Sequence, residues 1–305
     1  MKLSVLSKQI RRILILLICL FSLISNSQVI SNLVNNYSFE QYAVCPNGVG
    51  GAVLGGIVSY WFPPVYYATP DYFHTCATAT IVAVPQNLAG FQSPKTGSAY
   101  VGCGFYVQAS EYRENLEVGL KQTLNNGKTY CVTFYVSLAE FSRYAISNLG
   151  VYFTNDSLKN YWPYVPPLNI FLSPSMENST TNIISDTLNW SQIQGTYIAN
   201  GVEAFMIIGN LRNDAGTTIL QIKPLDSNPN RNTSYYFIDD VSVVEINASN
   251  ANLKDTIFIC PNDSIILGTD SAWDATYSWQ ETGAGGSSLS CTNCAMPSVN
   301  TQQTT

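Results

Sequence analysis

The chain has few charged side chains and a single histidine. Charged residues make up 11% of its 305 residues, and the net charge at neutral pH is −6. No basic stripe follows the N-terminal segment, so nothing draws the chain to nucleic acid. His74 alone supplies no histidine cluster for zinc. A Ser-His-Asp hydrolase would need His74 as its base, and no Gly-x-Ser-x-Gly motif accompanies it. We therefore favour a structural or surface role for His74.

Long apolar runs are also scarce, and the one present lies at the N-terminus. Ile13–Ile24 is apolar, follows four basic residues, and precedes the small and polar run Ser25–Gln28. This pattern predicts a secretory signal over residues 1–27 and a secreted, extracellular protein. The alternative is an uncleaved membrane anchor. No later stretch is long and apolar enough to be a transmembrane helix.

Helical periodicity is nearly absent, which favours an all-β fold. Short apolar or alternating runs recur between Asn, Gly and Pro residues, and Asn125-Asn126-Gly127 predicts a hairpin turn between two of them. Such a chain forms a sandwich or a barrel. The predicted strands are Ala99–Phe105, Leu116–Leu120, Tyr130–Ala139, Asn148–Phe153, Ser191–Tyr197, Ala204–Gly209, Tyr235–Glu245, Thr256–Ile259, Ser264–Leu267 and Thr276–Gln280.

The pattern divides the mature chain into two parts. Residues 28–247 predict one β-sandwich, and residues 248–255 are polar and predict a linker. In residues 256–305, Trp279 follows Cys260 at a spacing seen in immunoglobulin-like sandwiches. Too few strands follow to close a sandwich, so we expect a partial immunoglobulin-like domain.

Acidic residues stand at both ends of the predicted sandwich. Glu40 ends the first segment, and Asp239 and Asp240 lie in the last strand. First and last strands of a sandwich often lie side by side, and converging oxygen ligands suit calcium. We therefore predict a structural calcium site at Glu40, Asp239 and Asp240, with exposed acids as the alternative. Alternation along a strand allows only one of the two aspartates to point to it, unless the strand is bulged.

Two long irregular segments carry clustered aromatic residues. Residues 41–95 include Trp61, Tyr66 and Tyr67, and residues 155–189 include Tyr161 and Trp162. Aromatic faces on loops can stack on sugar rings, which makes these five residues candidate ligand contacts. The alternative, which we favour, is that they fill a small core beneath the loops.

Three glutamates, Glu111, Glu114 and Glu117, lie close together and raise the question of a glycosidase. Paired carboxylates carry out glycoside hydrolysis. This run contains Arg113, however, and mixed runs of this kind are usually solvated or ion-paired. We therefore expect no enzymatic activity.

Export favours disulfides over free thiols. Four cysteines lie in the predicted sandwich and allow three pairings, of which we favour Cys45–Cys76 and Cys103–Cys131. The C-terminal part holds three more. Its Cys291-Thr292-Asn293-Cys294 run resembles half a zinc site, although oxidation is the favoured state.

An ordered set of motifs resembles secreted, cell-surface proteins of Bacteroidota. In that family a jelly-roll domain similar to carbohydrate-binding modules precedes immunoglobulin-like or polycystic-kidney-disease-like repeats, often in gliding-motility-associated, type IX secreted proteins. The motifs cover most of residues 30–245; they are Asn32–Glu40, Thr69–Phe73, Val84–Asn87, Thr96–Gly102, Tyr112–Glu114, Tyr130–Glu140 and Ile238–Val241. No sorting domain is present, which leaves type IX export open.

The resemblance implies a galactose-binding-like jelly-roll β-sandwich followed by an incomplete immunoglobulin-like sandwich. It implies non-catalytic glycan binding or adhesion, with a glycan or cell-surface partner. Glu40 and Asp239 or Asp240 match the calcium ligands of such jelly rolls. One alternative is a purely structural module of a surface adhesin or filament. Another is an accessory domain of a hydrolase whose catalytic part lies elsewhere.

Overall fold

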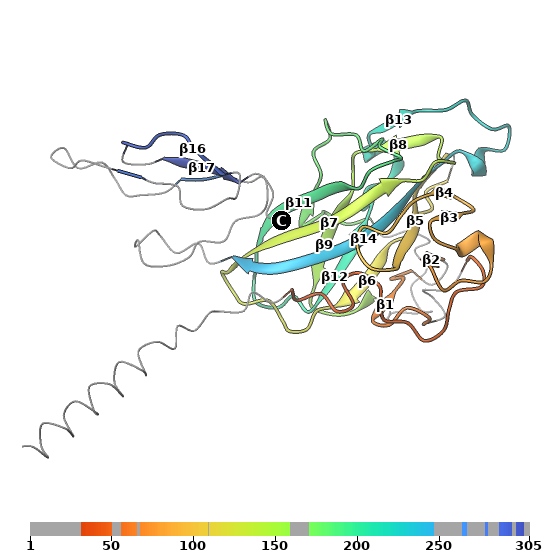
Figure 1. Ribbon diagram of the computed structural model, residues 1–305, viewed down its shortest axis with the longest axis horizontal. Helices are drawn as coiled ribbons and strands as arrows, with labels where there is room; N and C mark the ends of the chain where they lie inside the picture. The colour runs from red at the N-terminus through yellow and green to blue at the C-terminus, as the bar shows by residue number, and fades with distance from the viewer. Residues whose placement is uncertain are drawn as a thin grey trace, which may run out of the picture. The chain divides into compact units, whose positions relative to one another are not determined.

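The computed structural model describes residues 32–50, 56–65, 68–108, 110–158, 171–246, 264–266, 278–279, 287–294 and 297–301 (Figure 1). The predicted signal (1–27) and linker (248–255) lie outside these residues. Within them, no helix has the length and apolar character needed to cross a membrane.

Two five-stranded antiparallel sheets form a jelly-roll β-sandwich. We call them the β6–β12 sheet and the β7–β14 sheet. The first has the order β1 (Trp61–Phe62), β6 (Leu116–Gly119), β12 (Phe205–Gly209), β9 (Gly150–Thr154), β10 (Met176–Glu177). The second has the order β11 (Ser191–Ile198), β7 (Thr129–Leu138), β14 (Thr233–Ile246), β5 (Ala99–Val107), β2 (Asp71–His74).

Short elements accompany the sandwich. The pairs β3 (Gln86–Asn87) with β4 (Gly90–Phe91) and β8 (Tyr144–Ile146) with β13 (Ile219–Gln221) form two small sheets. Short 3₁₀ turns in the described connections include η1 (Thr80–Val82), η3 (Asp214–Gly216) and η4 (Pro229–Arg231). The predicted hairpin at Asn125–Gly127 is wrong, because β6 and β7 on either side of it belong to opposite sheets. A turn does form there, closed by Lys128 N–H donating to Asn125 O.

The core lies between the two sheets and follows the alternation of the strands. Val132, Phe134 and Val136 of β7 pack in the same cluster as Met206 and Ile208 of β12. Alternate residues of a strand point to opposite faces, so a period of two apolar residues fills the interior.

Tyrosines enter the core because their hydroxyls find partners inside it. Tyr72 OH donates to Phe39 O at 2.9 Å, and Tyr236 OH donates to Ile184 O at 2.7 Å. Burial raises the pKa of both phenols far above 10. These rings therefore stay neutral and bridge separate parts of the chain.

The β7–β14 sheet is also covered on part of its outer face. Phe73, Tyr100 and Phe237 form a second apolar cluster there with Val82 of η1. The ring centroids of Tyr100 and Phe237 lie 4.9 Å apart. Strand β5 is buried along almost its whole length because both of its faces are covered.

The cysteines match one of the two predicted pairings. A disulfide joins Cys45 to Cys76, whose Cα atoms lie 5.7 Å apart. The predicted Cys103–Cys131 pair is wrong: Cys103 is a buried free thiol, whereas Cys131 is disulfide-bonded to another residue. The physical reason is alternation, since Cys103 of β5 points into the core and Cys131 is excluded from that cluster.

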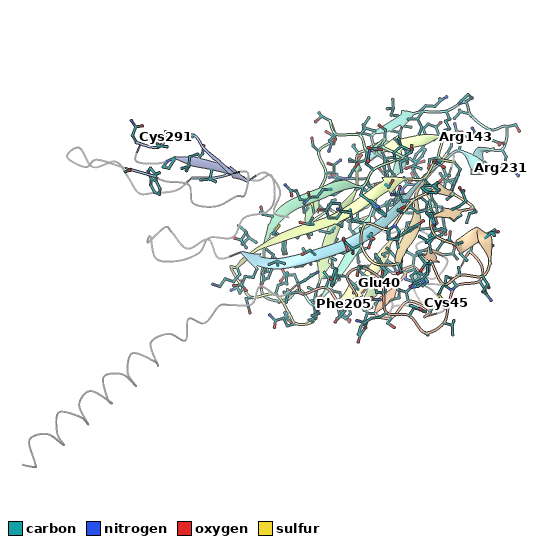
Figure 2. The ribbon with its side chains drawn as sticks, in the orientation of Figure 1. Glu40, Cys45, Arg143, Phe205, Arg231 and Cys291 are labelled. Carbon is teal, nitrogen blue, oxygen red and sulfur yellow. A yellow bond between two sulfur atoms is a disulfide. The ribbon has the colours of Figure 1, made fainter. Side chains whose placement is uncertain are left out.

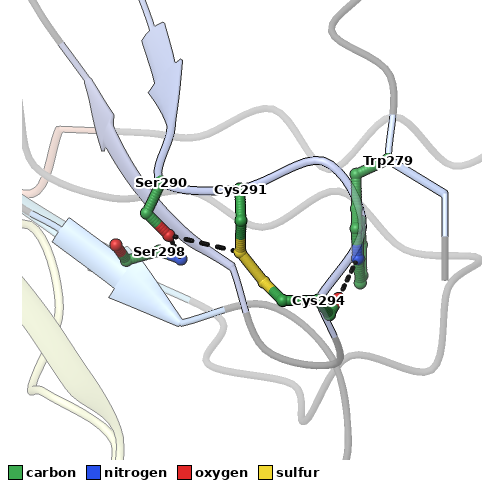
Figure 3. The surroundings of a disulfide bond; sticks show 5 residues. All are labelled: Trp279, Ser290, Cys291, Cys294 and Ser298. Atoms are coloured by element: carbon green, nitrogen blue, oxygen red, sulfur yellow. Dashed lines mark hydrogen bonds between the residues drawn. A yellow bond between two sulfur atoms is a disulfide. The ribbon is translucent and has the colours of Figure 1, made fainter.

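The C-terminal part contains a three-stranded antiparallel sheet with the order β15 (Ser264–Ile266), β17 (Ser298–Thr301), β16 (Ser287–Leu289). A disulfide joins Cys291 to Cys294 after β16, so this pair is oxidised (Figure 3). Trp279 Nε1 donates to Cys294 O at 2.8 Å. The tryptophan thus packs beside the second cysteine pair; Cys260, the predicted neighbour, lies outside the described residues.

Candidate functional site

The first and last segments of the sandwich lie side by side, as the sequence predicts. Leu33 N–H donates to Val243 O at 2.8 Å, and Val241 N–H donates to Tyr37 O at 2.9 Å. The Asn32 side chain adds contacts to the main chain of Val241 and Val243. The chain therefore closes on itself next to Glu40 and Asp240.

At this junction, Glu40, Asp239 and Asp240 form what we call the acidic corner. Glu40 Oε1 accepts from the N–H groups of Ser98 and Ala99 at 2.8 and 3.0 Å. The three acids hold the loop that precedes β5. Asp239 Oδ2 accepts from Lys95 N–H at 2.8 Å and from Thr96 N–H at 3.3 Å. Asp240 Oδ1 accepts from Thr96 Oγ1 at 2.6 Å.

A β-bulge lets neighbouring aspartates serve the same loop. The pairing of β14 with β7 shifts between Asp239 and Ser242, and Asp240 has a positive φ of 48°. A regular strand would send the two side chains to opposite faces. The bulge thus places both aspartate side chains against the same loop, the one case in which the sequence analysis allowed this.

Gly97 makes the close approach of Glu40 to this loop possible. Its φ is +65°, and a Cβ at this position would lie 2.3 Å from Glu40 Oε1. Glycine adopts such a φ without steric cost and leaves room for the carboxylate.

Burial dominates the electrostatics of the acidic corner. It raises the pKa of Asp239 to about 8, with the neighbouring charge of Asp240 adding to the effect and three N–H donors opposing it. Burial also raises the pKa of Asp240, and Glu40 adds to this while Thr96 and Lys95 oppose it. Extra negative charge is therefore costly here, and a cation would relieve that cost.

The fit to calcium is partial. Among the described residues, no group of three or more His, Cys, Asp or Glu side chains is placed to hold a metal ion. Within the same residues, Glu40 Oε2 and Asp240 Oδ2 accept no hydrogen bond, so two carboxylate oxygens remain for a cation. Calcium takes about six to eight oxygens, and the others would be backbone oxygens or water.

The outer face of the β6–β12 sheet carries a second set of candidate side chains. One row across neighbouring strands reads Phe62, Glu117, Ile207, Tyr152, and the next reads Gly119, Phe205, Thr154. None belongs to the central core cluster, because the alternate residues of these strands occupy it.

This outer face is covered at the first row and more open at the second. Glu117 and Ile207 are fully buried, and Leu158 N–H donates to Glu117 Oε1 at 3.1 Å. Phe205 is half-buried and labelled in Figure 2. A Cβ on Gly119 would lie 3.5 Å from the Phe205 ring, so the ring lies over the glycine. Tyr60, which directly precedes β1, is 55% exposed.

The five predicted ligand aromatics have different outcomes. Trp61 is not a surface residue: it is 2% exposed, its ring centroid lies 5.0 Å from that of Phe39, and its Nε1 donates to Asn36 O. Trp61 alternates with Phe62 and therefore points into the core, which excludes it from ligand stacking. The other four, Tyr66, Tyr67, Tyr161 and Trp162, lie outside the described residues.

The residues flanking those four aromatics nevertheless meet. Val65 and Ala68, on either side of Tyr66 and Tyr67, form one apolar cluster with Leu158 and Leu172, which bracket the second aromatic segment. The two aromatic segments therefore begin and end at a common place. Leu158 also contacts Glu117, which puts this place on the outer face of the β6–β12 sheet.

The acids considered for glycosidase chemistry differ from their predicted solvated state. Glu114 and Glu117 are buried, and only Glu111 is exposed, with its Oε2 accepting from Asp214 N–H. Arg113 is fully buried and lies 3.9 Å from Glu111, an ion pair within the run as expected, but its closer partner is Asp214, which lies outside the run. His74 is buried, and its Nδ1 accepts from Cys76 N–H at 2.8 Å, a structural role.

Sequence reasoning missed the burial of Asp71 and its proximity to Glu114. Asp71 lies in β2, a strand that the prediction omitted, and Tyr235 OH donates to its Oδ2 at 2.7 Å. The one available signal was Asp71 itself, an acid within the Thr69–Phe73 motif. Its partner could be found only by folding the chain.

No family model matches this chain, and no curated protein matches it. Solved structures with a similar fold include a Stig cyclase, FisC, from Fischerella sp. TAU (10% identity, TM-score 0.41, 71% of this chain and 97% of that one). They also include the CBM22-1 xylan-binding domain of Paenibacillus barcinonensis Xyn10C (11%, 0.38, 73% and 99%) and a CBM4 structure (13%, 0.32, 70% and 99%). Likeness at this level says nothing about what this chain binds.

Proposed function

We propose that this protein is a secreted, cell-surface-directed, non-catalytic glycan-binding protein. Its ligand face is the outer face of the β6–β12 sheet. The observation that carries the proposal is the common base of the two aromatic segments, formed by Val65, Ala68, Leu158 and Leu172 on that face.

The chemistry of this face suits a sugar chain. The Phe205 ring lies over Gly119, and Tyr152 and Thr154 stand on the neighbouring strand. Aromatic faces pack against the apolar C–H side of a pyranose, while hydroxyls and phenols bind its polar edge. Tyr66, Tyr67, Tyr161 and Trp162, which lie outside the described residues, remain predicted ligand contacts from the sequence.

The contacts of the candidate acids support a non-catalytic role. Glu114 accepts hydrogen bonds from Thr69, Tyr112 and Gly104. Glu40, Asp239 and Asp240 hold the loop 95–99. A general acid or nucleophile needs an oxygen directed at substrate, whereas these groups stabilise the fold.

We also propose a structural calcium ion at the acidic corner, with Glu40 and Asp240 as its side-chain ligands. The ion would neutralise the corner and join the two ends of the sandwich. Its role is stability, because the corner lies on the strands that close the domain.

A glycan array with the full mature chain tests the proposed function. We expect binding to one class of polysaccharide, and Phe205→Ala to weaken it by about tenfold, since loss of one aromatic contact costs on the order of 1 kcal/mol. The double variants Tyr66→Ala/Tyr67→Ala and Tyr161→Ala/Trp162→Ala should weaken it further. Phe91→Ala is the matched control, because Phe91 is 52% exposed but lies in β4, outside the proposed face.

Two outcomes would contradict this proposal. Binding to no glycan would favour the purely structural module. Equal affinity of the Phe205 and Phe91 variants would place the ligand elsewhere on the surface.

A further inference from the structure

Two buried carboxyl groups lie on the outer face of the β7–β14 sheet, away from the acidic corner. Asp71 of β2 is 9% exposed and Glu114 is 7% exposed. Asp71 pairs with Gly102 of β5, and Glu114 Oε2 accepts from Gly104 N–H at 2.7 Å. A Cβ on Gly104 would lie 3.4 Å from Glu114 Oε2, and a Cβ on Gly102 would meet Tyr235 OH, which donates to Asp71 Oδ2. Because Gly102 and Gly104 are alternate residues of one strand, the two acids lie on the same face of it. We call them the carboxyl pair.

The carboxyl pair holds the segment that the Cys45–Cys76 disulfide closes. Asp71 Oδ1 accepts from Gly50 N–H at 2.6 Å. Glu114 Oε1 accepts from Thr69 N–H and Thr69 Oγ1 at 3.3 and 3.0 Å. Gly50 and Thr69 both lie between the two cysteines, and Thr69 closely follows Tyr66 and Tyr67 in the chain.

No basic side chain in the described residues faces this pair. Arg113 adjoins Glu114 in the chain, but its guanidinium pairs with Asp214. From residue 41 to residue 94 the sequence has no lysine or arginine, and His74 faces Tyr42 and Tyr72 instead. The titratable groups that face the pair are Tyr112 from the preceding segment and Tyr235 from β14, while the Cys103 thiol lies on the core side of β5.

Like charges in a buried site oppose joint ionisation. Burial raises the pKa of Asp71, against the donors Gly50 and Tyr235. Burial likewise raises the pKa of Glu114, and the charge of Asp71 adds to it. Both effects favour the protonated form of the pair relative to exposed carboxyl groups.

We propose that Asp71 and Glu114 form a proton-dependent latch on the disulfide-closed segment, and through Thr69 on the base of the first aromatic segment. With a proton on the pair, Gly50 and Thr69 are held. When both groups ionise, their mutual repulsion favours release of Gly50 and Thr69, which we call the opened form. The effect on ligand binding rests on the proposed glycan-binding function, whereas the latch itself does not.

The raised pKa values determine how the stability of the closed form changes with pH. A carboxyl with a raised pKa in the closed form binds its proton more tightly there than in the opened form. The closed form is therefore fully favoured at low pH and loses free energy as the pH rises through the folded pKa. Affinity for a glycan at this face should fall in the same direction.

Hydrogen exchange at single backbone amides tests the latch in the full mature chain. As the pH is raised and the pair loses its proton, we expect the protection factors of Gly50 and Thr69, corrected for intrinsic exchange, to fall by about tenfold. The amides of Gly201 and Val202 are the matched control. They also donate to a carboxylate, Glu203 Oε2, but the pKa of Glu203 is about 2, so their protection should not change.

Asp71→Asn removes one charge and keeps both contacts. Its Oδ1 can accept from Gly50 N–H, and its Nδ2 can donate to the Tyr235 oxygen. We expect the pH dependence at Gly50 and Thr69 to disappear. Glu114→Gln should do the same at Gly50, and the wild-type exchange data decide if either variant fails to fold.

The outcomes separate the two proposals. Constant protection in the wild type, or an unchanged pH dependence in Asp71→Asn, would overturn the latch. If the protection of Gly50 and Thr69 changes with pH but no glycan binds at any pH, the proposed function is removed and the latch is supported. If their protection changes with pH but glycan affinity stays constant, the link between the latch and the ligand face is overturned.

Discussion

Single residues with left-handed backbone shape the acidic corner. Phe39, which precedes Glu40, and Asp240 have φ values of 63° and 48°. Tyr60, which directly precedes β1, has a φ of 71°. This conformation is costly for side chains larger than glycine or asparagine. The cost is offset where the residue is held by its surroundings, as when Tyr72 OH donates to Phe39 O.

Gly97→Ala should destabilise the protein. The added methyl group meets Glu40 Oε1 and the φ of +65° becomes strained, so we expect a loss of about 2 kcal/mol or more in the free energy of unfolding. Chemical denaturation measures it.

Two other glycines separate the causes. Gly127 has a similar φ of +73° but no atom within 4 Å of a built Cβ, so Gly127→Ala reports backbone strain alone, about 1 kcal/mol. Gly48→Ala has neither feature and should be nearly neutral. If Gly97→Ala costs no more than Gly127→Ala, Glu40 is not held as closely as described.

At the scale of elements, the bulge in β14 decides what the acidic corner does. It directs Asp239 and Asp240 to one loop, where their negative charges repel each other. A proton or a cation would reduce that repulsion. We therefore expect the stability of the strand that closes the domain to depend on pH and, through the proposed site, on calcium.

The stability of the calcium-free protein should fall as the pH rises from about 5 to about 8.5. The folded pKa of Asp239 is about 8 and its ordinary value is 3.8, so the stabilisation is fully present below the lower value and lost through the higher one. In EDTA we expect Tm to fall by about 5 °C or more. Added calcium at the upper pH should restore it.

Both the acidic corner and the carboxyl pair are expected to lose stability as the pH rises. The variant Asp240→Asn tests the contribution of the acidic corner alone. The asparagine Oδ1 can still accept from Thr96 Oγ1, and its neutrality lowers the pKa of Asp239. The variant should show a shallower fall of Tm with pH and a weaker response to calcium. An equal response of variant and wild type to calcium would remove Asp240 from the proposed ligands.

At the scale of the whole molecule, the fold depends on joining its two ends. Asn32 Oδ1 accepts from Val243 N–H and Val34 N–H, while its Nδ2 donates to Val241 O. One amide side chain thus connects segments about two hundred residues apart. Ordering such distant segments costs loop-closure entropy, which specific contacts must outweigh.

Asn32→Ala should lower the free energy of unfolding by about 1–3 kcal/mol, because it leaves main-chain groups of β14 without their partner. Asn35→Ala is a useful comparison, since the Asn35 side chain donates one bond, to Gly119 O. Its loss should be smaller. The order of the two midpoints in urea checks this, and the reverse order would contradict the role of Asn32 in closure.

The sequence was sufficient for the fold class and for most of the long strands. The alternation in β5, β7 and β14 arises from burial on the core face, which is written in the chain itself. The sequence did not predict β2, because both faces of this strand are covered, all four of its residues are buried, and no alternation results. Cys103 and Cys131 were paired wrongly for a related reason: strand alternation sends them to opposite faces of one sheet.

By itself, the sequence determined an all-β sandwich and the adjacency of Glu40 to the Asp239–Asp240 segment. Each depends on periodicity or on matched ends. Only the tertiary structure decided that Trp61 is core, that Asp71 and Glu114 are neighbours, and that the bases of the aromatic segments meet. The physical reason is that burial, pKa and contact between distant residues depend on strand order and register, which local pattern does not contain.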